Sequence, residues 1–284
     1  MHSRVKELIN RGLQPWNVRV QSLTAERAEK ARLSALEAAG YFDRPVFPLL
    51  DSFRLCDPTP IFVGVQRFAD LTSRFSRAEG FNAYSFDNDY FSSPDAEVAY
   101  ALVRELSPRR IVEIGSGNST LLFRAAIADG NLKTELVSID PSPRRDIKRV
   151  ADRILRKKLE EVGEEELVAS LDSGDILFID SSHVIAAAND VVTLLLRIIP
   201  ALKVGVVIHL HDIFLPFEYP REWLVQLGWR WNEQYLVQAL LQDSQALEVI
   251  WPGHYLQRTS KDFLACFDVR GIRRASSLWL RKTE

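Results

Sequence analysis

From residue 95 onward, short apolar runs alternate with longer segments in which apolar positions recur every three or four residues. The short runs are typical of buried strands and the longer segments of amphipathic helices. Strands and helices in this alternating order form βαβ units, in which a parallel sheet carries helices on both faces. The pattern therefore predicts an α/β fold with a Rossmann-like, doubly wound, mostly parallel seven-stranded sheet.

The expected strands cover residues 110–114, 135–139, 153–157, 175–179, 204–211, 247–251 and 277–281. The expected helices cover residues 95–106, 120–129, 144–151, 164–171, 185–199, 220–227 and 232–242.

The first 93 residues lack this alternation, and we expect them to form an amino-terminal helical extension or cap on a domain of residues 94–284. A helix is predicted from Thr24 to Gly40, a residue that commonly ends helices. Residues 41–60 contain four prolines and predict an extended connector. The aromatic-rich residues 65–91 suit a lid or pocket wall, or simply core packing.

Composition narrows the possible partners. The 284 residues are 46% hydrophobic and 26% charged, as in ordinary globular proteins. With 36 basic and 38 acidic residues the formal net charge is −2, so nucleic acid is a poor candidate substrate. Apolar runs fall short of the ~18 residues of a membrane span. The two cysteines, Cys56 and Cys266, suggest neither a disulfide framework nor a zinc site, so we expect a cytoplasmic protein.

The segment IVEIGSGNST places a glycine-rich turn between an apolar strand and a helix, where backbone N–H groups can face a ligand. Gly115 and Gly117 permit a tight turn. Glu113 precedes the turn, where its carboxylate could receive a cationic amine directly or through water. Asp140 ends the next strand, which is where such a sheet presents an acid to the hydroxyls of a ribose.

Two cofactor classes could use this turn. A nicotinamide fingerprint would place a third glycine at Thr120, and a pyrophosphate would be repelled by Glu113. S-adenosyl-L-methionine (SAM) carries an ammonium group and no phosphate, so it fits Glu113 better.

The motifs EIGSGNS, VSID, DILFID and VVIHLHD make residues 95–284 resemble the class I SAM-dependent methyltransferases. FIDSSH and HDIFxPFEYP further resemble a bacterial branch that acts on small molecules. The resemblance implies that Asp140 binds the ribose and that an acid after the third strand, Glu160 or the favoured Glu161, reads adenine. Ser119 stands where the family has its third glycine. The implied cofactor-binding residues are Glu113, Gly115, Ser116, Gly117, Asn118, Ser119, Asp140 and Glu161.

Polar side chains follow the fourth and fifth strands, and ligands of open α/β sheets lie outside such carboxyl ends. The expected catalytic residues are Asp180, His183, His211 and Asp212. A histidine suits proton transfer near neutral pH, so we hypothesise that His183 or His211 deprotonates a hydroxyl while Asp180 or Asp212 orients it. His209 is expected to be a buried structural residue.

Several alternatives remain open. Asp180 and Asp212 resemble the metal aspartates of catechol-type methyltransferases, but Ile213 stands where those proteins usually have Asn, so Mg²⁺ is not favoured and the metal ligands are unknown. A catalytically silent SAM-binding protein and a nicotinamide-dependent oxidoreductase are the rival functions. By analogy, the acceptor is a small-molecule hydroxyl, on a sugar or a secondary metabolite, and the amino-terminal helices could mediate a homodimer.

Overall fold

A computed structural model describes residues 3–77, 80, 83–267 and 273–284. The chain forms two compact units, Met1–Arg44 with Tyr219–Trp229, and Pro45–Glu218 with Arg230–Glu284. The boundary expected at residue 93 does not coincide with this division. Residues after 45 group with the sheet because Phe53, Val65 and Phe75 lie in its hydrophobic core.

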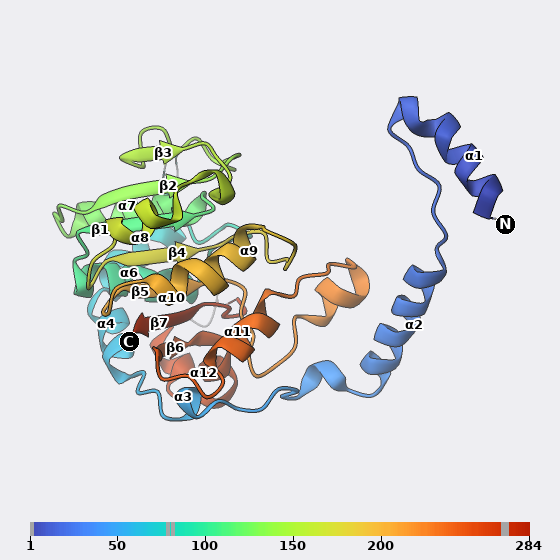
Figure 1. Ribbon diagram of the computed structural model, residues 1–284. Helices are drawn as coiled ribbons and strands as arrows, with labels where there is room; N and C mark the ends of the chain where they lie inside the picture. Colours follow the sequence, from blue (N-terminus) through green and yellow to red (C-terminus); the bar gives the residue numbers. More distant parts are fainter. Residues whose placement is uncertain (1–2, 78–79, 81–82, 268–272) are drawn as a thin grey trace. The chain divides into compact units, whose positions relative to one another are not determined.

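The larger unit contains the predicted seven-stranded sheet, with strand order β3-β2-β1-β4-β5-β7-β6 (Figure 1). Neighbouring strands are parallel except at β7, which is antiparallel to both β5 and β6. The strands are β1 (Arg110–Ile114), β2 (Glu135–Ile139), β3 (Arg153–Leu155), β4 (Ile176–Ile179), β5 (Val207–Leu210), β6 (Leu247–Pro252) and β7 (Leu278–Lys282). The α/β fold expected from the sequence is confirmed.

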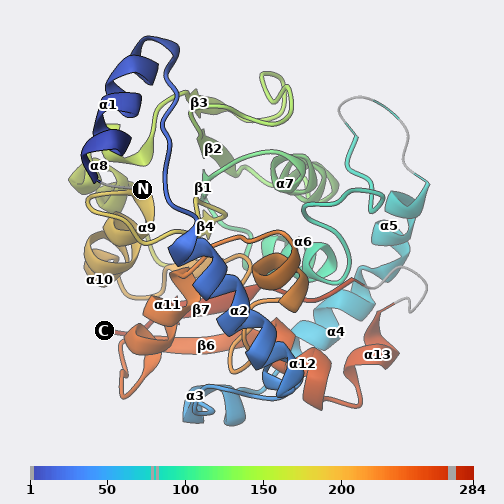
Figure 2. The ribbon, with the colours of Figure 1, turned by 90° about the vertical axis from the view of Figure 1, so that its right-hand side faces the viewer.

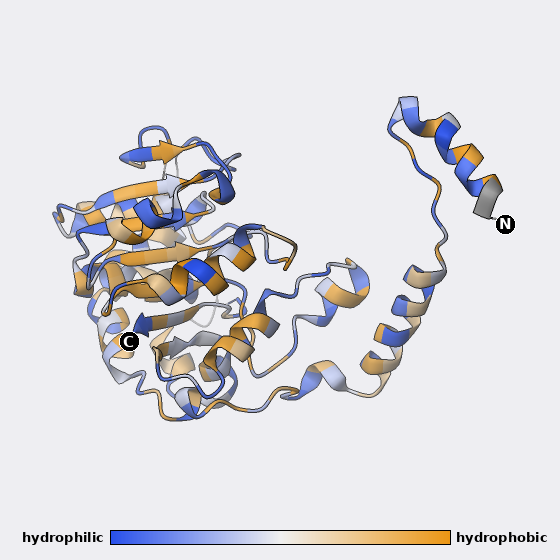
Figure 3. Cartoon of the chain, in the orientation of Figure 1, coloured by the Kyte–Doolittle hydropathy of each residue, from blue (hydrophilic) through white to orange (hydrophobic). Residues whose placement is uncertain are grey.

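Helices cover both faces of this sheet. Figure 2 shows α8, α9, α10 and α11 along one face and α4, α6 and α7 along the other. Strand β4 is apolar along its whole length (Figure 3), as a strand covered on both faces must be. The helical segments of this unit are α3 (Asp51–Arg54), α4 (Thr59–Arg67), α5 (Ala69–Ser73), η3 (Arg74–Ser76), α6 (Asp95–Leu106), α7 (Asn118–Asp129), η4 (Leu159–Glu161), α8 (Glu164–Ser170), α9 (Asp190–Thr193), η5 (Leu194–Ile198), α10 (Ile199–Ala201), α11 (Glu233–Leu241), α12 (Gly253–Thr259) and α13 (Phe263–Cys266).

The helix predicted over 144–151 is wrong. This segment forms turns, in which the Asp146 carboxylate accepts the backbone N–H of Lys148 at 3.2 Å. Aspartate commonly competes with helix formation through such local bonds. The connector over 41–60 is also not wholly extended, because η2 (Tyr41–Asp43) and α3 interrupt it and α4 begins at Thr59.

The helix predicted from residue 185 begins five residues later, at Asp190. Asn189 caps it, since its side chain accepts the N–H of Val192 at 3.2 Å and donates to the carbonyl of Val184 at 2.5 Å. The sequence pattern also missed α12 and α13. The remaining strand and helix predictions of this unit are confirmed within a few residues at their ends.

The smaller unit is helical and comprises α1 (Ser3–Leu13), η1 (Gln14–Trp16), α2 (Thr24–Ala38), η2 (Tyr41–Asp43) and the π-helical turn η6 (Glu222–Gln226). Within it, α2 lies against η6, and Glu37 pairs with Arg221. The predicted stop at Gly40 is borne out by its left-handed backbone, with φ of 67°. Among the described residues, no helix combines the length and apolar character needed to cross a bilayer.

Candidate functional site

The turn between β1 and α7 passes unusually close to the end of β4. A Cβ atom on Gly115 would lie 2.0 Å from the carbonyl oxygen of Asp180, and the φ of Gly115 is 81°. Only glycine meets both conditions, because other residues clash at that distance and disfavour that φ. The glycine predicted for a tight turn therefore brings the β1 turn and the β4 end together.

Glu113 lies beneath this turn and is fully buried. Its two carboxylate oxygens accept hydrogen bonds from the hydroxyls of Ser119 and Thr120 in the first turn of α7. Burial raises the pKa of Glu113 to about 8, although these hydroxyls oppose the shift. The structure therefore presents Glu113 as a support of the turn, and Ser119, at the family's third glycine, supplies one of the supporting bonds.

A cleft of about 450 Å³ opens at the carboxyl ends of β1, β2 and β4. Asp140 stands in its wall, where its carboxylate accepts the Ser116 N–H at 2.8 Å and the Ser142 N–H at 2.7 Å. The lining residues are Ile114, Gly115, Ser116, Ile139, Asp140, Pro141, Ser142, Arg144, Lys158, Leu159, Glu160, Asp180, Ser181, Ser182, Asn189 and Asp190. Gly115, Ser116 and Asp140, three of the residues expected to bind the cofactor, thus line one cleft.

The two acids after β3 face different cavities. Glu160 lines the 450 Å³ cleft, whereas Glu161 lines a neighbouring cavity of about 220 Å³. The Glu161 carboxylate accepts the N–H of Lys158 at 3.0 Å, which closes the 3-10 turn η4. Glu160 is therefore better placed than the favoured Glu161 to meet a ligand in the cleft.

A second cleft of about 530 Å³ adjoins the first and shares Ser116, Arg144 and Asp180 with it. Gly117, Asn118 and Ser119 line it at the start of α7, together with residues 87–91. The guanidinium of Arg144 lies 4.6 Å from the centre of the Tyr90 ring, a cation–π distance. The aromatic segment before residue 94 thus supplies both cleft wall and core, since Tyr84 and Phe91 are buried.

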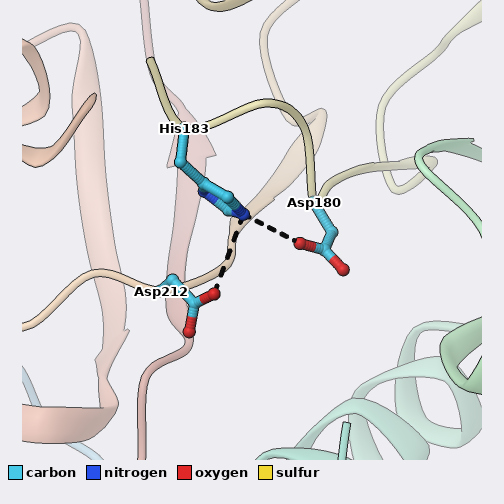
Figure 4. Close-up of side chains that lie close together, drawn as sticks. All are labelled: Asp180, His183 and Asp212. Carbon is cyan, nitrogen blue, oxygen red and sulfur yellow. Dashed lines mark hydrogen bonds and ion pairs between the residues drawn. The ribbon is translucent and has the colours of Figure 1, made fainter. Parts of the chain in front are cut away.

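Three of the predicted catalytic residues meet at the carboxyl ends of β4 and β5 (Figure 4). Nε2 of His183 lies 3.2 Å from Asp180 and 3.7 Å from Asp212. Both His183 (φ 59°) and Asp212 (φ 58°) have left-handed backbones, a conformation that side chains other than glycine rarely adopt without support. We refer to Asp180, His183 and Asp212 as the acid–histidine cluster.

A fourth residue, which the sequence reasoning missed, completes the surroundings of His183. Oε2 of Glu233 lies 2.9 Å from Nδ1 of His183, so this ring contacts a carboxylate at each nitrogen. Burial disfavours the charged ring, yet the hydrogen bonds with Asp180 and Glu233 raise the pKa of His183 well above its ordinary value. These two hydrogen bonds therefore favour the charged form of the His183 ring. Burial likewise opposes ionisation of Asp180, but the hydrogen bond with His183 lowers its pKa.

The two histidines at the carboxyl end of β5, His209 and His211, differ in their surroundings. His209 is fully buried, stacks on Phe178 with ring centres 3.9 Å apart and places Nε2 2.8 Å from Ser277 Oγ. Burial lowers the pKa of His209 well below its ordinary value, so it stays neutral. His211 lies nearer the cluster, with Nε2 3.3 Å from the carbonyl of Tyr90 and 3.7 Å from Asp212. In contrast to His183, whose two ring nitrogens both contact carboxylates, His211 has no hydrogen-bond partner for its Nδ1 among the described residues.

The ligand atoms of the acid–histidine cluster lie within 4.8 Å of one another, which is compatible with a bound divalent cation. The donor set contains one imidazole nitrogen besides the two carboxylates. Mg²⁺ prefers oxygen donors, whereas Mn²⁺ and Zn²⁺ readily accept imidazole. The cluster therefore fits Mn²⁺ or Zn²⁺ better than Mg²⁺.

We compared the chain with curated proteins, solved structures and protein-family models. No curated protein matches the chain. The apo structure of CmcI-N160 is 16% identical, over 75% of this chain and 84% of that one, with a TM-score of 0.43. The SAH-bound Podospora anserina methyltransferase is 16% identical, over 94% and 100%, with a TM-score of 0.41. The Bacillus cereus O-methyltransferase in complex with SAH is 14% identical, over 81% and 93%, with a TM-score of 0.41.

Identities and scores this low do not assign a function. A family model adds a match in sequence, which runs from residue 112 in β1 to residue 213 just beyond β5. The matched stretch contains the β1 turn, Asp140 and the acid–histidine cluster. The part of the chain that lines the 450 Å³ cleft is thus similar to a family described as a methyltransferase domain.

Proposed function

We propose that this protein is a SAM-dependent methyltransferase that methylates a hydroxyl group of a small molecule. The observation that carries the proposal is the cleft in which the β1 turn, closed by Gly115 against Asp180, stands beside Asp140. The wall of that cleft has an excess of acids, Asp140, Glu160, Asp180 and Asp190, over the basic residues Arg144 and Lys158. This excess of negative charge disfavours a pyrophosphate and suits a nucleoside without phosphates. The methyltransferase match over residues 112–213 supports it.

SAM supplies an electrophilic methyl group on a positively charged sulfur, which leaves as a neutral thioether when the acceptor oxygen attacks. The protein then has to bind, orient and deprotonate the acceptor. Asp140 is suited to accept hydrogen bonds from the ribose hydroxyls, and Glu160 to accept one from the adenine amino group. The adjoining 530 Å³ cleft would hold the methionine part and the acceptor next to Asp180.

The acid–histidine cluster would remove the acceptor's proton. Glu233 accepts the Nδ1–H of His183, so loss of the other proton leaves a basic lone pair on Nε2. That nitrogen lies between Asp180 and Asp212, which would stabilise the imidazolium formed when it takes the hydroxyl proton. We assign His183 as the base and the two aspartates as its charge partners.

A metal-assisted route is the second candidate mechanism, because the cluster atoms lie close enough to share a cation. A bound Mn²⁺ or Zn²⁺ would lower the pKa of the acceptor hydroxyl. Turnover that survives EDTA and dialysis supports the histidine route. Loss of turnover that Mn²⁺ or Zn²⁺ restores would replace it with the metal route.

The first experiment is calorimetric titration with SAM, with S-adenosylhomocysteine (SAH) and, as a control, with NADH. We expect SAM and SAH to bind, Asp140→Asn to weaken both by about ten-fold or more, and NADH not to bind. Binding of NADH alone would favour the rival oxidoreductase and refute the proposal.

The second experiment measures SAH formation from SAM with a panel of sugars, phenols and hydroxy acids. Each acceptor is compared with its O-methylated form, which offers no hydroxyl. SAH formation that requires the free hydroxyl supports O-methylation. Binding of SAM without turnover on any acceptor, with or without added Mn²⁺, would favour the silent SAM-binding alternative.

A further inference from the structure

Glu233 is a buried acid on the far side of His183 from the two aspartates. It opens helix α11, 50 residues beyond His183, and only 2% of its side chain is exposed. Its Oε2 contacts His183, while its Oε1 has no hydrogen-bond partner among the described residues. A buried carboxylate with one partner is costly unless that partner is held firmly, so the pair constrains both residues.

Asn232 and Glu233 also form hydrogen bonds with the backbone of residues 183–185. The N–H groups of Asn232 and Glu233 donate to the carbonyl of His183 at 3.0 and 3.3 Å. The Asn232 side chain accepts the N–H of Ile185 at 2.5 Å. These bonds hold the left-handed backbone of His183, which would otherwise be disfavoured.

Trp231 fixes the plane of the ring. Its indole lies against the imidazole of His183, with ring centres 4.2 Å apart and planes inclined by 33°. A ring held on one face by an indole and at Nδ1 by a carboxylate has no freedom to flip. Its Nε2 must then point toward Asp180 and Asp212.

We propose that Glu233 is the positioning residue of the active site, which holds the Nδ1–H of His183 so that Nε2 faces the acceptor. The inference rests on the proposed methyl transfer, in which His183 is the base. A neutral histidine can carry its proton on either nitrogen, and only the form protonated at Nδ1 leaves Nε2 able to accept one. A carboxylate at Nδ1 selects that form, as the acid of hydrolytic triads does.

The test compares Glu233→Gln with wild type and with Glu248→Gln, an equal charge change at an exposed acid of β6 that pairs with Arg281 at 3.0 Å. Nitrogen-15 NMR of the five histidines, with His183 assigned by its loss in His183→Asn, reports the protonation of Nδ1. Steady-state kinetics use an acceptor from the hydroxyl panel. The melting temperature and the Kd for SAH report whether each variant is folded.

In Glu233→Gln we expect the Nδ1–H signal of His183 to be lost or displaced and kcat to fall about 10- to 100-fold. The acceptor KM and the Kd for SAH should stay within about two-fold, because the proposed binding places neither the acceptor nor SAH against Glu233. Glu233→Asp keeps the charge on a shorter side chain and should recover part of kcat. Glu248→Gln should match wild type in every measurement.

A folded Glu233→Gln with an unchanged Nδ1 signal, or with kcat within about two-fold of wild type, overturns the inference. So does an equal fall in kcat for Glu248→Gln. If wild type methylates nothing, the proposed function fails by the turnover test. The NMR comparison then still decides whether Glu233 holds the His183 ring.

Discussion

At the residue scale, Glu113 is a buried acid whose pKa lies at about 8 rather than at its ordinary 4.5. The folded protein therefore keeps a proton that the unfolded chain releases above pH 4.5. Stability should fall as the pH rises from about 4.5 toward 8, because the unfolded state is then favoured by deprotonation. The bonds from Ser119 and Thr120 reduce this cost without removing it.

Glu113→Gln should remove that pH dependence. We expect similar melting temperatures for wild type and variant at pH 5, and a variant more stable by roughly 2–4 kcal/mol at pH 9. Calorimetric melting between pH 5 and 9 measures the difference. Melting temperatures that run parallel across the range would show that Glu113 does not titrate as its burial implies.

Gly115→Ala should disrupt the cleft, because the new methyl group would lie 2.0 Å from the Asp180 carbonyl. We expect SAH binding to weaken by more than about ten-fold, with a loss of roughly 2–4 kcal/mol of stability. Gly174→Ala is the matched control, since Gly174 also has a positive φ, of 84°, but no atom lies within 4 Å of its would-be Cβ. Equal SAH binding by the two variants would contradict the steric argument.

The pH dependence of turnover follows from His183. Its pKa lies well above 6.5, so the charged ring stabilises the fold below that value, and this stabilisation is lost as pH rises through the folded pKa. Only the deprotonated ring is a base. We expect kcat to rise with pH through the alkaline range, about ten-fold per unit below the folded pKa.

His183→Asn should lower kcat and flatten this profile. His254→Asn is the control, because His254 lies in α12, contacts the Ala275 carbonyl at 3.0 Å and has a pKa lowered to about 4, chiefly by burial. A wild-type profile that stays flat, or a rise that persists in His183→Asn, would exclude His183 as the base.

At the scale of elements, strand β5 and the residue that follows it place two histidines in different surroundings. His209 points into the core between Phe178 and Trp279, and His211 lies one pleat further along. His209→Ala should cost roughly 1–3 kcal/mol through the lost packing and leave the Kd for SAH unchanged. Denaturant unfolding and calorimetry measure the two quantities. Weaker SAH binding at full stability would give His209 a binding role instead.

The local pattern of apolar and polar residues predicted the helices and strands that depend mainly on local interactions. The strand over 110–114 and the helix over 95–106 have the predicted bounds, since an apolar run and an amphipathic repeat are readable in the chain itself. The helix over 144–151 failed because the Asp146 side chain competes for the backbone, a choice that composition does not reveal. Helix periodicity likewise could not show that Asn189 would cap α9.

The site was predictable where topology alone brings residues together. Glu113 lies near the end of a parallel strand, and Gly115, Asp140 and Asp180 directly follow parallel strands, so their meeting at one edge was expected. Glu233 was not, because its contact with His183 spans 50 residues and an acid at a helix start commonly does no more than complement the helix dipole. Glu160 and Glu161 are neighbours in a 3-10 turn, in which successive side chains point about 120° apart. The sequence alone therefore could not show which of the two acids lines the 450 Å³ cleft.

At the scale of the whole molecule, both clefts and the acid–histidine cluster lie in one unit and the amino-terminal helices in the other. None of residues 5–44 is buried, so this stretch contributes little apolar burial to stability. Its exposed apolar residues include Val5, Leu8 and Trp16. Both clefts are lined by residues of the larger unit, so ligand binding should not need this stretch.

Deletion of residues 1–44 therefore tests where folding and binding reside. We expect residues 45–284 to melt within about 2–4 °C of the full chain, a difference of roughly 1 kcal/mol, with the same Kd for SAH. The full chain carrying Val5→Ser and Leu8→Ser is the control for loss of exposed apolar surface alone. A larger drop in melting temperature, or loss of SAH binding, would mean that the extension completes the larger unit, since burial within the smaller unit cannot account for either effect.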